Sequence, residues 1–521
     1  MNVLRTRIRA GVLVVGGGLV GLTAALLLRH HGVDVTLVER HATTSPQPKA
    51  RRFHTRTMEV FRELGAAELV HDAARDLAGH YHMAAGRTLA EAEQLPLWQP
   101  SGPAGEDVEP SPELPCLVAQ DVLEPVLRRA ALDAGADVRF RTAMTGFTSG
   151  ADGVVAELHD LASDRHERLQ VPLLVAADGA RSPVRTALGI GRSGRGAIGG
   201  PGVNVYFRAD LADVVRGREF NLCQIEHPDA PGALASVDGR ARWVFMAAGG
   251  ETDRDWPALL RAALGVAAPD LDVLSVLAWQ PEMLVADRYS AGPVHLAGDA
   301  AHVMPPFAAS GANTGIADVH NLGWKIAAVL AGTAAPALLD SYDAERRPAG
   351  WFAADQSSRR STDLRSAAPD DALAHPYVLA AGGFQYPSGA LVGGPDQGGE
   401  IEPVHVFEPA GRVGTRVPHR WLDATRTRST LDLAGPGWAL VVGGDPAPWE
   451  RCAADSPVPL PVHRVEAGFL PAGCALLLRP DHVVAWRGPD PAQLPDVVRV
   501  LLGAPAGAAP PLSAIGTADR A

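Results

Sequence analysis

A glycine-rich turn near the start of the chain has the spacing of a nucleotide-binding motif. Gly16-Gly17-Gly18-Leu19-Val20-Gly21 follows the β-branched run Val12–Val15 and opens the helical pattern Leu19–His30. Gly16 permits a tight turn, and Gly18 lets a pyrophosphate approach the backbone at the positive end of the helix. A strand, a glycine turn and a helix in this order predict a dinucleotide site.

The residues that follow indicate which dinucleotide this site takes. Gly32 ends the helical pattern, and a second strand, Val33–Val38, leads directly to Glu39. A carboxylate at the end of this strand can accept hydrogen bonds from a ribose diol. It would also repel a 2′-phosphate, so the motif predicts FAD or NAD rather than NADP at this position.

A second constellation, over residues 294–326, separates FAD from NAD. A short apolar strand at 294–297 runs into a turn with Asp299 just past its end, where a carboxylate can bond the ribityl hydroxyls of a flavin. Gly311–Gly315 then opens another helix, whose amide groups would stabilise the negative charge of a reduced flavin. A nicotinamide dehydrogenase has no need of this constellation, so we predict FAD.

Three separated motifs carry a resemblance to a known family. They are the glycine turn with Glu39, the segment Ala177-Asp178-Gly179-Ala180-Arg181-Ser182-Pro183-Val184-Arg185, and Gly298-Asp299 with its helix. Smaller matches are Arg56-Thr57-Met58-Glu59, Gln120 with Leu123-Glu124, and Asn321-Leu322-Gly323-Trp324-Lys325. The sequence resembles the FAD-dependent aromatic hydroxylases of the para-hydroxybenzoate hydroxylase type. It is most similar to the bacterial polyketide hydroxylases with a C-terminal thioredoxin-like domain.

The resemblance implies further cofactor contacts. Gln120 would contact the phosphate or ribityl region of the flavin, Asp178 would support the flavin and nicotinamide site, and Pro306 would lie beside the reactive ring edge. Two positions depart from the family, which often has Arg in place of Lys49 and Gly in place of Arg52; both side chains are expected to reach the pyrophosphate. The predicted cofactor-binding residues are Gly16, Gly18, Leu19, Val20, Gly21, Glu39, Arg40, Lys49, Arg52, Gln120, Met144, Asp178, Asp299, Pro306, Gly311, Ala312 and Asn313.

The predicted fold class is α/β, in three parts. A Rossmann-like FAD-binding domain is expected over 1–80, 115–190 and 286–375, with a substrate domain inserted over 81–114 and 191–285. The resemblance implies a thioredoxin-like α+β domain over 400–503, and the Ala/Pro/Gly-rich segment 504–521 reads as a flexible tail. Helical patterns are expected over 54–75, 120–134 and 313–331.

The substrate domain is expected to contain an antiparallel sheet that roofs the flavin. Between about 200 and 285, short strand patterns alternate with turns. Alternation puts Leu222 and Gln224 on one face and Cys223 on the other, but it does not say which face lines a pocket. Tyr206, Gln224 and Phe245 are the predicted substrate contacts.

Composition excludes several classes of protein. The 521 residues are 46% hydrophobic and 20% charged, with a net charge of −12, which argues against binding to nucleic acid or to an anionic membrane. The four cysteines form no CxxC pair, so neither a dithiol redox centre nor a zinc site is expected. We find no Ser/His/Asp set, assign no catalytic side chain, and expect a cytoplasmic protein without a bound metal.

The function implied by the resemblance is that of a flavin-dependent monooxygenase. NADPH or NADH would reduce FAD, and a flavin C4a-hydroperoxide formed with O2 would hydroxylate a phenolic, polycyclic substrate. Baeyer–Villiger oxygenation of a ketone is the close alternative. A non-catalytic flavin-binding protein and a nicotinamide dehydrogenase are alternatives from other classes. The sequence does not determine the identity of the substrate, the carbon that is attacked or the choice between NADPH and NADH. It also does not determine whether the protein is a monomer or a homodimer.

Overall fold

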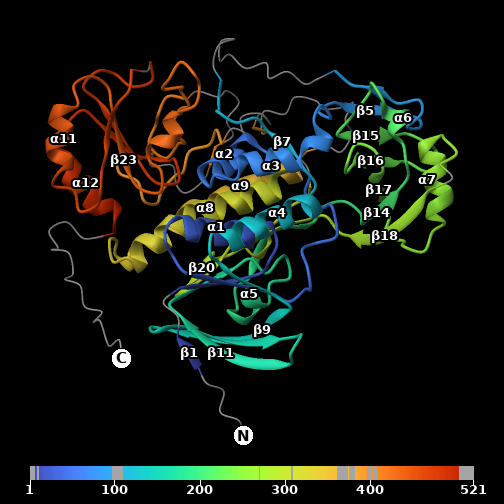
Figure 1. Cartoon of the computed structure of the whole chain (residues 1–521), viewed down its shortest axis with the longest axis horizontal. Coiled ribbons are helices and arrows are strands. Elements are labelled where there is room, and N and C mark those ends of the chain that lie inside the picture. The colour runs from blue at the N-terminus through green and yellow to red at the C-terminus, as the bar shows by residue number, and fades with distance from the viewer. Residues whose placement is uncertain are drawn as a thin grey trace, which may run out of the picture.

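The structure is a computed structural model, and Figure 1 shows how its sheets and helices are arranged. It describes residues 6–8, 11–96, 109–268, 270–306, 309–360, 373–374, 382–395, 401–402, 409–466 and 468–503. The tail predicted at 504–521 lies outside the described residues, and the predicted domain boundaries remain predictions.

A six-stranded sheet forms the centre of the molecule, in the order β20-β21-β12-β2-β3-β8. All neighbouring pairs are parallel except β20 and β21, and β2 lies between β12 and β3 as the βαβ pattern requires. The buried strands are near-continuous Val and Leu runs, as in parallel sheets covered on both faces. These strands are Ser290–Ala291, Val294–Leu296, Leu173–Ala176, Val12–Val15, Val35–Glu39 and Asp137–Phe140.

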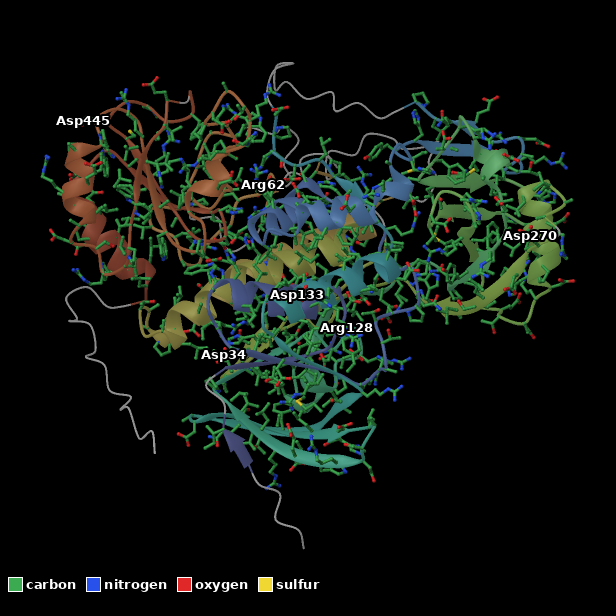
Figure 2. All side chains as sticks on the ribbon, in the orientation of Figure 1. Asp34, Arg62, Arg128, Asp133, Asp270 and Asp445 are labelled. Carbon is green, nitrogen blue, oxygen red and sulfur yellow. The ribbon has the colours of Figure 1, made fainter. Side chains whose placement is uncertain are left out.

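Helices cover this sheet, and α1 (Leu19–His30) packs between α4 (Gln120–Asp133) and α8 (Ser310–Leu330). Arg128 of α4 lies over the Phe140 ring at 4.2 Å and joins that helix to β8 (Figure 2). Helix α9 (Asp340–Ser358) packs against α8, and the short α5 (Pro183–Ala187) follows β12.

Two smaller sheets flank this unit. The order β1-β11-β10-β9 comprises Thr6–Ile8, Arg165–Val171, Gly153–Asp160 and Thr142–Gly150, and the order β13-β19-β22 comprises Arg192–Ala197, Glu282–Ala286 and His302–Val303. The short strands β4 (Arg52–Phe53) and β7 (Cys116–Leu117) pair antiparallel.

A seven-stranded sheet stands to one side of the molecule, at the right of Figure 1. Its order is β18-β14-β17-β16-β15-β5-β6, and helix α7 (Trp256–Leu264) belongs to the hydrophobic cluster on one face. All neighbours are antiparallel except β15 and β5. The strands are Asp272–Trp279, Gly202–Arg208, Arg242–Ala248, Gly232–Ser236, Leu222–Ile225, Met83–Gly86 and Glu93–Gln94, and α6 spans Ala212–Val215.

The C-terminal part forms a four-stranded sheet, at the left of Figure 1. The order β24-β23-β25-β26 comprises Val462–Arg464, Ala439–Val442, Ala475–Leu478 and Val484–Gly488. Helices α11 (Ala447–Ala453) and α12 (Leu494–Leu501) pack in the cluster on one face. The thioredoxin-like assignment remains a prediction.

Local details differ from the sequence expectations. The helix expected over 54–75 is two helices, α2 (Thr55–Glu63) and α3 (Ala67–Ala73), because Gly65 between them adopts φ +67°. Helix α8 begins at Ser310, three residues before the expected start. Among the described residues, no helix is both long and apolar enough to cross a membrane.

Candidate active site

The glycine turn has the tight geometry that its spacing predicts. Gly16 adopts φ +111°, and a Cβ there would lie 2.2 Å from the carbonyl oxygen of Ala177. A Cβ on Gly21 would lie 1.9 Å from the carbonyl oxygen of Gly16. Gly17 donates its N–H to Glu39 Oε2 at 2.7 Å. The protein's own packing therefore requires Gly16 and Gly21. Glu39, which was predicted to bind the ribose, also holds the turn through its bond with Gly17.

Gly18 is different, because nothing in the protein requires a glycine there. Its φ of −83° is open to any residue, and the nearest atom to an added Cβ is Glu124 Oε1 at 3.5 Å, an ordinary contact. Gly18 is also the N-cap of α1, where backbone N–H groups point outward without intrahelical partners. Open space before a helix N-terminus fits the pyrophosphate of FAD.

Replacing Gly18 with alanine should therefore weaken FAD binding without unfolding the protein. A methyl group forced into a tight contact costs about 1–3 kcal/mol, so we expect roughly tenfold lower affinity. Fluorescence titration of apoprotein with FAD measures this. Gly21→Ala is the control and should lower the melting temperature of the apoprotein instead. Unchanged FAD affinity in a folded Gly18→Ala variant would contradict this role for the turn.

Helix α4 fixes the segment that runs past the turn. Gln120 accepts the N–H of Ala50 at 3.2 Å and donates to Glu124 Oε1 at 2.7 Å. Glu124 also accepts the N–H of Ser45 at 2.7 Å. Burial raises the pKa of the Glu124 carboxyl, although hydrogen bonds from Ser45 and Gln120 oppose the shift. Gln120 and Glu124 thus fix the segment beside the α1 turn, and the flavin contact of Gln120 remains a prediction. Glu124 was not among the residues selected from the sequence.

Three basic residues on this segment and next to Glu39 have exposed side chains: Arg40, Lys49 and Arg52. The carbonyl of Arg52 accepts a hydrogen bond from Asn313 Nδ2 at 3.1 Å, so its backbone lies beside the start of α8. Although the Arg52 side chain has solvent access, the protein atoms around its guanidinium lower the Arg52 pKa. The segment therefore runs from Ser45, bonded to Glu124 beside Gly18, to Arg52 beside the start of α8. We call the region between these two helix starts, bordered by Gly18, Lys49, Asp299 and Gly311, the groove.

The turn at Gly298-Asp299 packs against the N-terminal ends of α1 and α8. Gly298 has φ +61°, and Cβ atoms built on Gly298 and Gly315 would lie 2.8 and 2.6 Å from Val20 Cγ2. The N–H of Gly298 is held by Asp318 Oδ2 at 3.0 Å. Asp299 is solvent-exposed, yet the protein atoms around its carboxyl raise its pKa. The charges of His302 and Lys49 oppose this rise in the pKa. Segments hundreds of residues apart thus converge here, around an accessible carboxylate.

The DG motif lies beside the same turn. Asp178 Oδ2 accepts the N–H of Val184 at 3.0 Å, whereas its buried Oδ1 has no hydrogen-bond partner among the described residues. Burial raises the pKa of this carboxyl. Arg185 donates to the carbonyls of Ala300 at 2.9 Å and Ala180 at 3.2 Å. Arg185 therefore ties the DG motif to the Gly298 turn, a role that the sequence did not reveal.

The start of α8 presents backbone rather than side chains. Ala309, its N-cap, adopts φ +54°. The Asn313 side chain is fully engaged: it accepts from His54 N and Thr57 Oγ1 and donates to the carbonyls of Arg52 and Ala309. The N–H groups of the first turn, including Gly311 and Ala312, have no i−4 partner within the helix. Pro306 is exposed just before residues 307–308, which lie outside the described part of the chain.

Two predicted cofactor residues are hydrophobic packing residues in the structure. Leu19 is buried in the central core. Met144 lies on β9, partly buried against the same core. Both side chains therefore contribute to hydrophobic packing, and their contacts with FAD remain predictions.

The seven-stranded sheet has two distinct faces. Tyr206, Val244 and Ala235 cluster with Ala119, the residue before α4. Tyr206 OH accepts a 3.5 Å hydrogen bond from Arg242, which pairs with Asp121 Oδ2 of α4 at 2.9 Å. This face therefore looks toward the groove.

The predicted substrate contacts divide between the two faces. Gln224 alternates with the buried Cys223 and Ile225 and shares the groove-facing side with Leu222 and Tyr206. Phe245 lies on the other face, 1% exposed, in the core with Trp256 of α7. The expectation for Phe245 is therefore wrong: strand alternation aims it away from the groove.

The cysteines have the character of packing residues. Burial raises the pKa of Cys116 to about 11 and that of Cys223 to about 12, which keeps both as thiols. Cys452 and Cys474 are free and pack against two different hydrophobic clusters of the C-terminal sheet.

Replacing both Cys452 and Cys474 with serine should leave turnover largely intact, because neither belongs to a dithiol. The steady-state rate and the amount of bound FAD in the folded double variant measure this. Lost turnover with normal FAD content would show that a thiol of the C-terminal part takes part in the reaction.

Comparison with known proteins identifies the family. Residues 9–357 match the FAD binding domain model, and residues 410–505 match the model for the aromatic-ring hydroxylase C-terminal domain. The chain is 39% identical to tetracenomycin B2 monooxygenase-dioxygenase of Streptomyces olivaceus, over 94% of this chain and 97% of that protein. It is 38% identical to aklavinone 12-hydroxylase of Streptomyces peucetius, over 85% and 93% of the two chains.

A solved structure shows the same fold. The ternary complex of aklavinone-11 hydroxylase with FAD and aklavinone superposes with a TM-score of 0.84 and 32% identity, covering 95% of this chain and 99% of that one. The open space at Gly18, the unpaired Asp178 Oδ1 and the accessible Asp299 fit a bound FAD in this chain. The chain belongs to the FAD-binding aromatic-ring hydroxylase family and is an FAD-dependent monooxygenase.

Proposed function

We propose that the protein hydroxylates a phenolic, fused-ring substrate with O2 and NADPH or NADH, and that the substrate lies between the groove and the seven-stranded sheet. The observation that carries this is the groove-facing side of that sheet, where Tyr206 and Gln224 stand among apolar side chains. Such a surface suits a flat aromatic molecule with few polar groups. Relatives named as tetracenomycin and aklavinone oxygenases support the fused-ring class.

The segment before α2 joins the sheet to the groove. Arg51 donates to the carbonyls of Asn221 and Ser236, at the ends of β15 and β16. Gln47 Nε2 donates to Ser275 Oγ of β18 at 3.1 Å. The sheet is thereby fastened to the same segment that carries Lys49 and Arg52. A roof held in this way can exclude water from the reacting groups.

The groove residues then have distinct roles toward FAD. The α1 N-terminus at Gly18 would bind the pyrophosphate, with Lys49 adding positive charge. The backbone N–H and the ring Nδ1 of His41 both bond to Glu39 Oε1, so Oε2, which accepts the N–H of Gly17, keeps a lone pair for the ribose. Asp299 accepts hydrogen bonds from the ribityl hydroxyls. The N–H groups of Gly311 and Ala312, with Arg52 beside them, would interact with the flavin ring. When bound, FAD supplies the redox chemistry that activates dioxygen.

The protein's own work is binding and positioning. Asp178, with one free oxygen, orients a polar group of FAD or of the nicotinamide. Helix α8 directs its positive end at the ring edge that becomes anionic on reduction. Tyr206, whose hydroxyl Arg242 holds, and Gln224 orient the phenol of the substrate. We assign no side chain as a general base.

Nicotinamide oxidation tests this proposal. Purified protein should be yellow, and NADPH or NADH oxidation should accelerate when a fused-ring phenol such as a hydroxyanthraquinone or a naphthol is added. A monocyclic control is a substituted catechol, because a relative in Burkholderia is named 4-methyl-5-nitrocatechol 5-monooxygenase. Stimulation by catechols alone would refute the fused-ring class but keep the monooxygenase. A ketone converted to an ester would support the Baeyer–Villiger alternative.

A further inference from the structure

The hairpin turn between β25 and β26 inserts a conspicuous set of polar residues into the rest of the protein. Arg479, Asp481 and His482 are 0%, 2% and 3% exposed, although a hairpin tip is ordinarily solvated. His482 also adopts φ +63°, a costly conformation for a residue other than glycine. Such burial and strain at a turn imply that its surroundings hold it firmly.

The first half of the turn joins α8 to α9. Arg479 donates to both oxygens of Glu345 on α9 at 2.8 Å and to Asp481. Asn321 of α8 donates to Asp481 Oδ2 at 3.0 Å and to Glu345 Oε2 at 2.6 Å. Lys325 of α8 donates to Glu345 Oε2 at 3.0 Å. Two cations and two anions thus balance in a buried cluster that spans α8, α9 and the turn.

The second half of the turn joins α8 to α2. Arg56 donates to the Asp481 carbonyl at 2.7 Å and to His482 Nδ1 at 2.8 Å. Glu63 lies 3.2 Å from His482 Nε2 and 2.7 Å from His320 Nε2 of α8.

The hydrogen-bond donors around Glu63, His320 and His482 decide whether these residues can bind a metal ion. Because Arg56 can only donate, His482 Nδ1 must accept, and the His482 proton is on Nε2, directed at Glu63. A metal ion would need that Nε2 lone pair. The group has the spacing of a metal site, but its hydrogen bonds make it an interdomain clasp.

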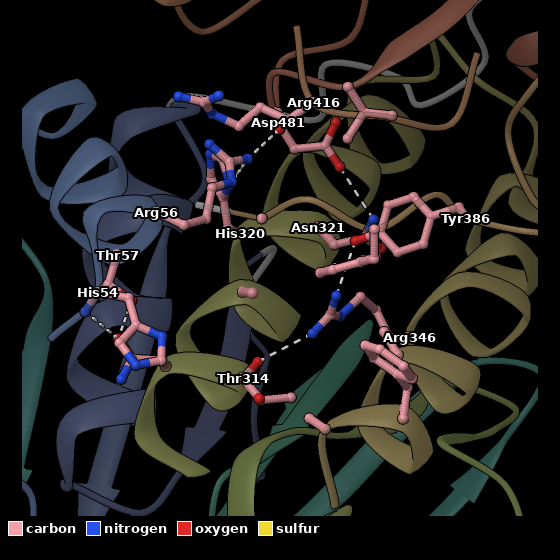
Figure 3. Close-up of a pocket in the computed structure, with 18 of the residues that line it drawn as sticks. His54, Arg56, Thr57, Thr314, His320, Asn321, Arg346, Tyr386, Arg416 and Asp481 are labelled. Atoms are coloured by element: carbon pink, nitrogen blue, oxygen red, sulfur yellow. Dashed lines mark hydrogen bonds between the residues drawn. The ribbon is translucent and has the colours of Figure 1, made fainter. Parts of the chain in front are cut away.

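A cavity beside α8 increases the importance of the contacts that the Arg479–His482 turn makes with this helix. It measures about 90 Å³ and lies along one side of the helix, from Ser310 and Asn313 to Asn321. Tyr386 and Asp481 also line it. Figure 3 shows Arg346 of α9 bonded to Thr314 of α8 and to Tyr386, and Asn321 of α8 bonded to Asp481. Close packing is interrupted on this side, so discrete polar bonds hold the first three turns of α8 there.

We propose that the Arg479–His482 turn of the C-terminal domain is a positioning element for α8, fixing the helix whose first turn faces the flavin. This rests on the proposed placement of the flavin ring at Gly311 and Ala312. Asp481 and His482 touch neither FAD nor substrate in this account and act through Asn321, Glu63 and His320. The C-terminal domain thereby shapes the flavin site from the far side of the helix.

Two conservative variants test the proposal in the full-length protein. Asp481→Asn removes the charge that balances Arg479, and His482→Asn removes the clasp while retaining a residue that tolerates a positive φ. Each should raise the Kd for FAD three- to tenfold, shift the visible spectrum of bound flavin, and speed hydrogen–deuterium exchange at residues 310–318. Arg487→Met is the matched control, since among the described residues Arg487 bonds carbonyls of its own domain, at Ala410, Gly411 and Phe469.

The outcomes separate positioning from simple stability. A lower melting temperature in the Asp481 and His482 variants, with FAD affinity, flavin spectrum and exchange at 310–318 all as in wild type, would reduce the turn to a docking contact. The same changes in Arg487→Met would assign them to general destabilisation and also overturn the proposal. Exchange in the apoprotein reports on α8 without FAD. If exchange responds while the wild type binds no FAD, the flavin placement fails but the positioning of α8 stands.

Discussion

Asp299→Ala is expected to weaken FAD binding about ten- to hundredfold. The carboxylate is accessible in the groove, has no hydrogen bond from a described residue, and lies where Gly298, Val20 and Gly315 converge. Hydrogen bonds to a charged acceptor are worth about 1.5–3 kcal/mol, which gives this range. Titration of apoprotein with FAD measures the change, and Asp229→Ala, at an exposed aspartate of the substrate domain, is the control.

The same variant should not destabilise the apoprotein. Crowding raises the Asp299 pKa in the folded state, so the ionised carboxylate costs stability at any pH above the unfolded pKa near 3.9. Thermal unfolding at pH 7 should therefore give a melting temperature equal to or above that of wild type. A lower melting temperature together with unchanged FAD affinity would make Asp299 a structural residue.

Asp318→Ala is expected to cost about 3–5 kcal/mol of folding free energy, as breaking buried ion pairs does. Asp318 is fully buried and accepts from Arg346 at 2.9 Å, His302 at 2.7 Å and the N–H of Gly298 at 3.0 Å. Its loss leaves the buried Arg346 guanidinium without a carboxylate partner and releases the N–H of Gly298. Denaturant unfolding of the apoprotein measures the loss.

The pH dependence of this interaction has a definite sign. Burial would raise the Asp318 pKa, but His302 and Arg346 outweigh it and the folded-state pKa is lowered. The stabilisation is therefore complete above the unfolded pKa near 3.9 and disappears as pH falls through the lower folded value. Asp133→Ala, in the exposed pair with Arg129 on α4 (Figure 2), should change stability by less than about 1 kcal/mol. Equal losses in the two variants would refute the structural role of Asp318.

Local sequence patterns predicted the parts of the site that local rules determine. The turn at Gly16, the helix Leu19–His30 and Glu39 lie within about thirty residues, and their spacing alone specifies a βαβ unit. Alternation likewise separated Gln224 from Cys223. Which face meets the groove depends on how the sheet docks on α4, and this is why Phe245 was misassigned.

The residues that sequence reasoning missed act over long separations. Glu124 holds Ser45 across 79 positions, and Arg185 holds Ala300 across 115. Asp318 lies on a buried part of α8 and belongs to no recognisable sequence motif. The only available signal was an ionisable residue within a buried pattern, which rarely occurs without a partner. The docking of the Arg479–His482 turn was equally unreadable, because its partners belong to another domain.

Labelled dioxygen tests the central claim, that this chain is a monooxygenase, most directly. With ¹⁸O2, a nicotinamide and a fused-ring phenol that stimulates nicotinamide oxidation, mass analysis should find one labelled atom in the hydroxylated product and the other in water. Label recovered only as hydrogen peroxide with every phenol and ketone tried, while the flavin is still reduced, would make the protein an oxidase and contradict the account.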